Sequence, residues 1–350
     1  MKVPRYKWQP TTAEIAVSAG IAPEEVERFD HNTSPFPTEW AGAAAADSLA
    51  SLNEYPGANY RGLREAAAEI NGLEPEQIVP GAGADELILL SGRAFLDRGA
   101  TAVAATPTYP LYEISTLQAG AVFQAVPSSP PDFGFPTDDL VRAARDADLV
   151  WICAPSNPIG NDVPADGVDA AIAATDGLVA VDAAYAEFSS ATWADRVNRH
   201  HNLIVLRTLS KAFGIAGARV GYGMAHPDLV AAIDGVRPPG SISSPSVVLG
   251  ITALRNPQRM QAMVGEITAS RTLLSDSLAA LGLRALPSET NFVLCEVGAT
   301  AHDIAENLTG IGLVARKFPA DGPLRNYLRF TVRSVAAHDR LLTALERYLP

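Results

Sequence analysis

Lys211 is the residue whose surroundings most strongly suggest chemistry. It lies in the stretch VLRTLSKAFGIAGARVGYGMA (205–225), between an apolar segment and a run of small residues, and Arg219 follows eight positions later. Because lysines usually lie on solvated surfaces, this position predicts an amine inside a site. Burial and nearby positive charge lower the pKa of a lysine and make its amine a nucleophile. Taken singly, Lys211 also fits a side chain that extends from a strand end to solvent.

A second segment has the pattern of an anion site. The residues GAGADEL (81–87) follow the apolar QIVP and open a predicted helix. The backbone N–H groups of Gly83, Ala84 and Asp85 can therefore point toward a negative charge at the helix N-terminus. The same glycines also fit an ordinary turn from strand to helix, so this segment alone is not specific.

The elements predicted to position these residues alternate between helices and short apolar strands from about residue 58 onward. Examples are the helical YRGLREAAAEIN (60–71) and the strand-like DLVWICAP (148–155). This alternation predicts a parallel sheet with helices on both faces. Ligands of such sheets bind beyond the carboxyl ends of the strands. Polar residues follow the predicted strands at that edge: Tyr109, Asn157, Asp182, Tyr185, Thr208, Ser210 and Lys211.

After Gly240 the pattern changes. A long helical stretch interrupted by Pro257 predicts two helices or one kinked helix, and short strands and an amphipathic helix follow it. This part predicts a small α+β domain. Residues 31–37 (HNTSPFP) are too rich in proline and turn formers for regular structure. The predicted division is a large domain at 36–245 and a small domain made of 1–35 plus 246–350.

Composition limits the classes of function. The chain has 350 residues and a formal net charge of −12, with a pI near 5.0, which argues against binding to nucleic acid or to an anionic membrane. Cys153 and Cys295 lie far apart and form neither a disulfide framework nor a metal-binding pattern. The N-terminus lacks the apolar core of a signal peptide, and no apolar run approaches the roughly 20 residues of a spanning helix. We expect a cytoplasmic location and no metal.

Four motifs together resemble a known family: RTLSKAFGIAGARVG, YRGLREAAAEI, GADEL and LRFTV. They resemble the fold-type I enzymes that depend on pyridoxal 5'-phosphate, the aspartate aminotransferase superfamily, over nearly the whole chain. Within that superfamily they look most like histidinol-phosphate aminotransferases. The resemblance implies an α/β fold with a large cofactor-binding domain, whose mainly parallel central sheet is covered by helices, and a smaller α+β domain.

The resemblance also implies a role for each residue at the strand ends. Lys211 would form the covalent imine with the cofactor and then move a proton, while Asp182 would keep the ring nitrogen protonated so that the ring accepts electrons. Tyr109 would stack on the ring, and Asn157 and Tyr185 would bind its phenolic oxygen. The phosphate would be held by Gly83, Ala84, Asp85, Thr208, Ser210, Arg219 and, from the neighbouring subunit of a homodimer with shared active sites, Tyr55.

Two arginines would bind the substrates. Arg329 in YLRFTV matches the arginine that binds the α-carboxylate in aminotransferases, and Arg316 in GLVARKF matches one that contacts the distal phosphate in histidinol-phosphate aminotransferases. The implied reaction is a ping-pong transfer between an amino donor and a 2-oxo acid such as 2-oxoglutarate. The chain departs from the family at Thr33, where a glutamate is usual, and at Ala183, where a carboxylate is usual. An aromatic or other amino acid therefore stays open as the donor.

Two other functions stay open. A decarboxylase resembling threonine-phosphate decarboxylase shares the scaffold and releases carbon dioxide without any need for a 2-oxo acid. A non-catalytic relative that kept the fold is the third hypothesis, which the intact lysine, carboxylate and arginine disfavour. Single residues also fit structural roles: Asp182 a helix N-cap, Tyr109 and Tyr185 core aromatics, Tyr55 interface packing and Arg316 a surface charge.

Overall fold

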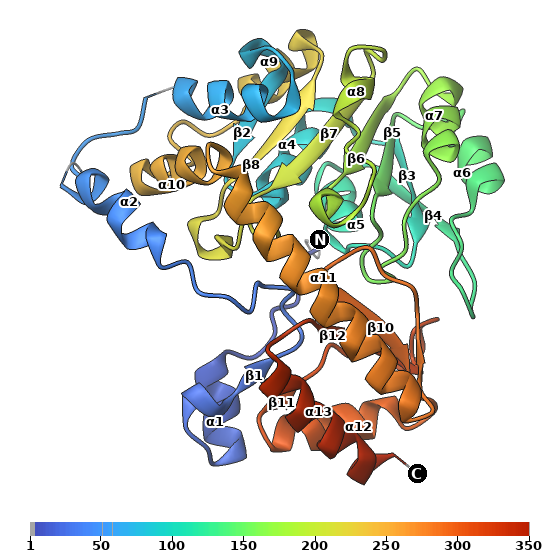
Figure 1. Ribbon diagram of the computed structural model, residues 1–350. Helices are drawn as coiled ribbons and strands as arrows, with labels where there is room; N and C mark the ends of the chain where they lie inside the picture. The colour runs from blue at the N-terminus through green and yellow to red at the C-terminus, as the bar shows by residue number, and fades with distance from the viewer. Residues whose placement is uncertain (1–3, 51, 58, 350) are drawn as a thin grey trace.

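A seven-stranded sheet with the strand order β2-β8-β7-β6-β5-β3-β4 forms the centre of the molecule (Figure 1). The computed structural model describes residues 4–50, 52–57 and 59–349. Strand β8 is antiparallel to β2 and β7, and the other neighbours are parallel, so the predicted mainly parallel sheet is confirmed. The strands are β2 (Ile78–Gly81), β3 (Thr101–Thr106), β4 (Val122–Pro127), β5 (Leu149–Cys153), β6 (Leu178–Asp182), β7 (Leu203–Thr208) and β8 (Gly221–Ala225).

Helices cover both faces of this sheet. Strands β5, β6 and β7 are buried at every residue, as expected for continuous runs of Leu, Val and Ile between two helical layers. One face packs against α4 (Ala84–Phe95), α5 (Leu111–Gln118) and α9 (Pro227–Val236). The other face packs against α3 (Arg61–Asn71), α6 (Thr137–Ala144), α7 (Ala165–Ala174) and α8 (Ala194–Val197). Beyond α3, α10 (Ser244–Leu254) packs on α2 (Trp40–Leu49) and on α3.

A smaller group of elements lies below the large sheet in Figure 1 and has its own apolar core. It contains the antiparallel strands β9 (Arg284–Ala285), β10 (Phe292–Glu296) and β12 (Tyr327–Thr331), and the parallel pair β1 (Glu27–Arg28) and β11 (Leu313–Val314). Its helices are α1 (Thr12–Ala19), α12 (Ala301–Gly310) and α13 (Val335–Tyr348). The long helix α11 (Pro257–Ala280) runs from the large sheet down to this group (Figure 1).

Pro257 occupies the first turn of α11, where its missing N–H costs nothing. The helical stretch after Gly240 is therefore two helices, α10 and α11, which is one of the two predicted forms. The boundary of the two predicted domains near residue 245 stays a prediction.

The N-terminal segment contacts both parts of the molecule. Thr11 and Glu14 form a capping box at the start of α1, and β1 pairs with β11. The preceding residues lead back toward the large sheet, where Gln118 Nε2 donates to the Pro4 carbonyl at 2.9 Å. Residues 31–37 form no helix or strand, as predicted. In the part of the chain that the structure describes, no helix is long and apolar enough to cross a membrane.

Candidate active site

The predicted polar residues gather at the carboxyl edge of the large sheet. Asp182 and Thr208 are the last residues of β6 and β7, and Asn157 lies four residues beyond the end of β5. Tyr109 follows β3, and its phenol donates to Asp85 Oδ1 at 3.0 Å. Because neighbouring parallel strands end at the same edge, residues far apart in the sequence form one cluster.

One end of the cluster is built to hold an anion. Gly83, with φ of 82°, precedes the first turn of α4, and a Cβ at this position would lie 2.8 Å from Arg219 Nη2. The Arg219 guanidinium reaches Asp85 Oδ2 at 2.9 Å and Ser210 Oγ at 3.4 Å, and Thr208 Oγ1 lies 3.0 Å from Ser210 Oγ. A helix N-terminus, two hydroxyls and a guanidinium therefore converge, which is a donor set suited to a phosphate dianion.

Lys211 is the next residue in the chain after Ser210 of this anion site. Its Nζ lies 5.9 Å from the centre of the Tyr185 ring, and among the described residues it has no hydrogen bond or ion pair. Removal from water, together with the positive charges of Arg329 and Arg219, lowers the pKa of Lys211 to about 8. Among the described residues the amine therefore has no hydrogen-bond partner, and a larger fraction of it is neutral at physiological pH than in an ordinary lysine, which favours its action as a nucleophile.

Asp182 is a buried carboxylate, 4% exposed, beneath the edge of the sheet. Burial raises its pKa to about 6, while hydrogen bonds from the Tyr112 phenol and the Ala184 amide act in the opposite direction. Tyr112 Oη lies 2.6 Å from Asp182 Oδ2, and Ala184 N lies 3.2 Å from Oδ1. Tyr112 was not predicted as a site residue from the sequence. Its only signal was a second tyrosine three positions after Tyr109.

The two predicted substrate arginines lie opposite each other. The backbones of Arg316 and Arg329 exchange both hydrogen bonds, at 3.1 and 3.0 Å, in an isolated antiparallel bridge, so their side chains leave the same face of this bridge. Arg329 Nη1 donates to Asn157 Oδ1 at 2.6 Å, and its guanidinium stacks on the Phe292 ring at 4.9 Å. Burial, with a smaller contribution from Arg316, lowers the pKa of Arg329 to about 10.

Two further residues near the cluster were not predicted from the sequence. Asn32, in the irregular segment before α2, donates through Nδ2 to the Tyr185 hydroxyl at 2.9 Å. Its backbone has φ of 52°, a conformation that asparagine tolerates better than most residues. The ring of Tyr6 lies 6.4 Å from that of Tyr109. Both residues come from the N-terminal segment, which no local pattern linked to the sheet edge.

Tyr55 is the one predicted cofactor residue that the structure does not bring into the cluster within a single chain. Its side chain is 92% exposed, on the segment after α2, and Leu49 and Leu52 nearby are also exposed. A single chain therefore leaves an apolar surface here.

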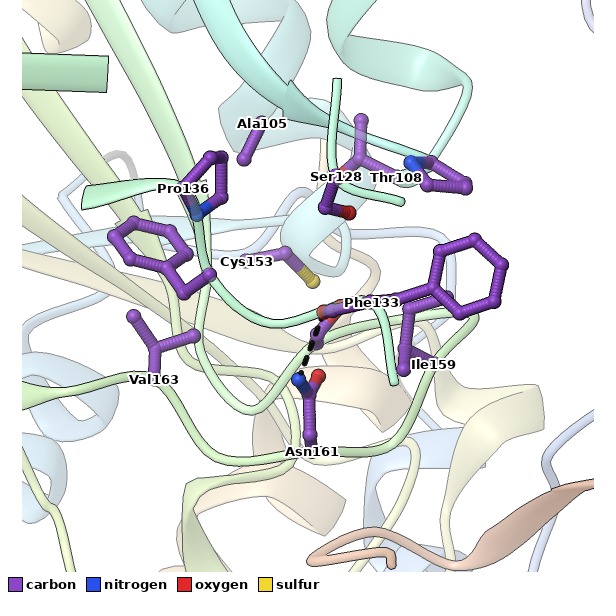
Figure 2. Close-up of a pocket in the computed structure, with 12 residues that line it drawn as sticks. Ala105, Thr108, Ser128, Phe133, Pro136, Cys153, Ile159, Asn161 and Val163 are labelled. Atoms are coloured by element: carbon purple, nitrogen blue, oxygen red, sulfur yellow. Dashed lines mark hydrogen bonds between the residues drawn. The ribbon is translucent and has the colours of Figure 1, made fainter. Parts of the chain in front are cut away.

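A small cavity lies behind the cluster, beside the end of β5. Its volume is about 20 Å³, and the Cys153 sulfur points into it (Figure 2). Asn161 Nδ2 donates to the Phe133 carbonyl across one side at 3.2 Å. Because this volume holds about one water molecule, the cavity is too small for a cofactor. The site of interest is the open edge of the sheet, between the anion site and the two arginines.

Comparison with known proteins agrees with this geometry. The family described as aminotransferase class I and II matches residues 26–345, and the chain belongs to it. A histidinol-phosphate aminotransferase of Archaeoglobus fulgidus is 35% identical over 93% of this chain and 95% of its own length. One from Caldanaerobacter subterraneus is 33% identical over 92% and 93%. The crystal structure of histidinol-phosphate aminotransferase from Sinorhizobium meliloti in complex with pyridoxal-5'-phosphate has a TM-score of 0.89 at 28% identity, with 97% of this chain and 95% of that chain covered.

The protein is therefore an aminotransferase of fold type I that depends on pyridoxal phosphate and resembles histidinol-phosphate aminotransferases, as the sequence predicted. Its substrates are a small-molecule amino donor and a 2-oxo acid. The residues present fit the cofactor, because an anion site, an unpaired amine and a buried carboxylate occur along one edge of the sheet. When bound, pyridoxal phosphate supplies a carbonyl for covalent attachment and a ring that accepts electrons.

Proposed function

We propose that this aminotransferase takes its amino group from a donor with a distal phosphate, of which histidinol phosphate is the best candidate, and passes it to a 2-oxo acid such as 2-oxoglutarate. The observation that carries the proposal is the isolated backbone bridge that sets Arg316, two residues after β11, opposite Arg329 of β12. The Arg316 guanidinium has no hydrogen bond or ion pair to any described residue. A free arginine beside a second one suits a donor with one distal anion and an acceptor with two carboxylates.

The roles proposed for the remaining residues follow from their surroundings. Lys211 would attach the cofactor and move a proton through Nζ, and Asp182 would keep the ring nitrogen protonated. Tyr109 would stack on the ring, and Asn157 and Tyr185 would donate or accept hydrogen bonds at its phenolic oxygen. Gly83, Ala84, Asp85, Thr208, Ser210 and Arg219 would hold the phosphate.

An aromatic amino acid is the alternative donor. The ring of Tyr6 lies 6.4 Å from that of Tyr109, and the Tyr6 phenol acts to raise the pKa of Arg329. Such an aromatic wall accepts an imidazole or a benzene ring equally well, so it supports both donors.

A panel of donors assayed with 2-oxoglutarate tests the proposal. Histidinol phosphate is expected to have a higher kcat/KM than phenylalanine, aspartate or phosphothreonine. A preference for phenylalanine would support the aromatic alternative. Carbon dioxide released from phosphothreonine without any 2-oxo acid would instead show a decarboxylase.

We also propose a homodimer in which Tyr55 from the partner subunit completes the anion site. The exposed side chains of Leu49, Leu52 and Tyr55 support it, because apolar residues gathered on one segment are typical of an interface. Sedimentation of the holoenzyme measures this, and a monomeric mass would contradict it. The cytoplasmic location stays a prediction.

Substitution of the two arginines is expected to have different effects on different donors. Arg329→Ala should lower kcat/KM by about a hundredfold for every donor with an α-carboxylate, because that carboxylate loses a charge-assisted pair. Arg316→Ala should impair the reactions with histidinol phosphate and glutamate but spare phenylalanine, which has no distal anion. Single-turnover kinetics with the three donors, followed by the absorbance of the bound cofactor, measure both effects.

Arg325→Ala is a matched control, because Arg325 is exposed and lies in the segment between Arg316 and the start of β12. It should leave all three half-reactions unchanged. Equal damage by Arg316→Ala to every donor would show that Arg316 has a structural role and would refute the division of labour between the two arginines.

The capture of pyridoxal phosphate by the apoenzyme is expected to accelerate with pH, with a midpoint near pH 8, and to level off about two units higher. Only the neutral amine of Lys211 attacks a carbonyl, and its pKa is lowered to about 8 from 10.5. The neutral fraction therefore increases as the pH rises through about 8 and is nearly complete two units higher. Stopped-flow absorbance at constant ionic strength measures the rate. A rate that is still rising steeply above about pH 10 would contradict the lowered pKa.

A further inference from the structure

Tyr112 makes the shortest contact to the carboxylate of Asp182. Its hydroxyl is buried and donates to Asp182 Oδ2 at 2.6 Å, across 70 positions of sequence. The Ala184 amide donates to the other oxygen, Oδ1, at 3.2 Å. Each carboxylate oxygen therefore already has one protein donor, which fixes the plane of the carboxylate. None of the roles described above uses the Tyr112 hydroxyl.

A closed set of contacts holds the Tyr112 ring in place. The ring stacks on the Trp151 indole, with centroids 5.2 Å apart and planes 7° from parallel. The indole Nε1 donates to Thr116 Oγ1 at 3.3 Å, and that hydroxyl donates to the Tyr112 carbonyl at 2.8 Å. Helix α5 and strand β5 are thus connected both by this ring stack and by the Thr116 hydroxyl. Rotation of the phenol away from Asp182 would break the stack.

Cys153, the last residue of β5, lies next to Asp182 in the sheet. Cys153 pairs in register with Asp182, and its sulfur accepts a hydrogen bond from the backbone N–H of Asn157 at 3.3 Å. Burial, with a smaller contribution from the charge of Asp182, raises the pKa of the Cys153 thiol to about 12, so the thiol stays neutral. Burial and the Asp182 charge likewise raise the pKa of Tyr112 well above its usual value. Both neighbours therefore stay uncharged across the working pH range.

Charged and titratable groups on other elements also face Asp182. Asp85 on α4 raises the pKa of Asp182, and Lys211 after β7 lowers it. The phenols of Tyr109 and Tyr185 also sense the charge of Asp182, which raises the pKa of each. Among the groups that favour the anion, the Tyr112 hydrogen bond has the largest effect.

We propose that Tyr112 is a positioning residue for Asp182, whose phenol fixes the orientation of the carboxylate and preserves its negative charge for the ring nitrogen of the cofactor. The inference rests on the proposed role of Asp182. A carboxylate that retains its charge attracts a protonated ring, whereas a neutral carboxyl group does not. The removal of a phenol donor leaves a buried oxygen unpaired, and the carboxyl group then takes up a proton at higher pH.

The test compares Tyr112→Phe with Tyr222→Phe. Tyr222 is also buried, and its hydroxyl accepts a hydrogen bond from Asn71 Nδ2. It packs on the other face of the sheet from Tyr112. Both variants keep the ring and lose one hydroxyl, so their melting temperatures report the purely structural cost. The probe is pyridoxamine 5'-phosphate, which binds the apoenzyme without a covalent bond to Lys211. Its dissociation constant is measured by fluorescence between about pH 5 and pH 8.

The wild-type affinity is expected to fall as the pH decreases through about 6, since Asp182 must then lose a proton for the charge pair to form. In Tyr112→Phe this fall should begin about one pH unit higher. The kcat for the preferred donor should decrease about tenfold with an unchanged KM, because the two arginines are untouched. Tyr222→Phe should match the wild type in both measurements.

Thr116→Val serves as a second variant, which loosens the stacked rings without contact to Asp182. Thr116→Val should also raise the pH at which the affinity for pyridoxamine 5'-phosphate falls, by a smaller amount. It covers the case in which Tyr112→Phe does not fold. If the affinity of the folded variants falls at the same pH as that of the wild type, the role of Tyr112 is overturned. If Asp182→Asn shows the same fall in affinity near pH 6 as the wild type, the role proposed for Asp182 fails instead. The two failures are therefore distinguishable.

Discussion

Lys211→Ala is expected to lower kcat by roughly a thousandfold or more, because it removes both the nucleophile that attaches the cofactor and the base that moves the proton. The cofactor should still bind through the anion site, whose residues do not include the amine. Reduction of the wild-type holoenzyme with borohydride, followed by peptide mass spectrometry, should place the cofactor adduct on Lys211. The alanine variant should show no adduct.

Two further variants separate the possible reasons for the loss. Lys211→Arg keeps the positive charge but has no nucleophilic amine at neutral pH, so it should be as inactive as the alanine variant. Lys317→Ala removes an exposed lysine that pairs with Glu306 at 3.1 Å, and it should retain full activity. Substantial turnover by Lys211→Arg would show that the site needs a cation rather than an amine. An adduct on Lys317 would refute the assignment of Lys211.

Asp182→Asn is expected to lower kcat by about a thousandfold, the upper range for the loss of one preorganised electrostatic partner in an active site. The amide has the same shape, so the fold and the melting temperature should change little. It cannot hold a proton on the ring nitrogen by charge, and the ring then accepts electrons poorly. Stopped-flow kinetics of the half-reaction with the preferred donor measure the chemical step directly.

Asp148→Asn is the matched control, since Asp148 also lies beside a sheet strand but at the opposite edge, where its Oδ2 accepts from the Thr101 amide at 2.7 Å. It should leave the half-reaction unchanged. A kcat of Asp182→Asn within about threefold of the wild type would contradict the proposed role, because the loss of a hydrogen bond to a charged group alone is larger than that.

Sequence patterns were sufficient for the strands that carry the site. Continuous apolar runs such as LVWIC and LVAVD predict β5 and β6, because strands covered on both faces need apolar residues at every position. Residues that directly follow such strands share one edge of the sheet, so Lys211 and Asp182 were identified from local sequence. Edge strand β4 gave no such signal, since only Val126 within it is buried.

The contacts across the site were decided only by the tertiary structure. Tyr112 reaches Asp182 across 70 positions, Asn32 reaches Tyr185 across 153, and Arg329 reaches Asn157 across 172. Periodicity and turn chemistry act over a few residues and place each side chain on an edge or a face. Which side chains then meet depends on how α5 packs on β5, and on how β12 and the irregular segment before α2 lie against the end of the sheet. These packings bury residues from distant segments together, and no local pattern contains them.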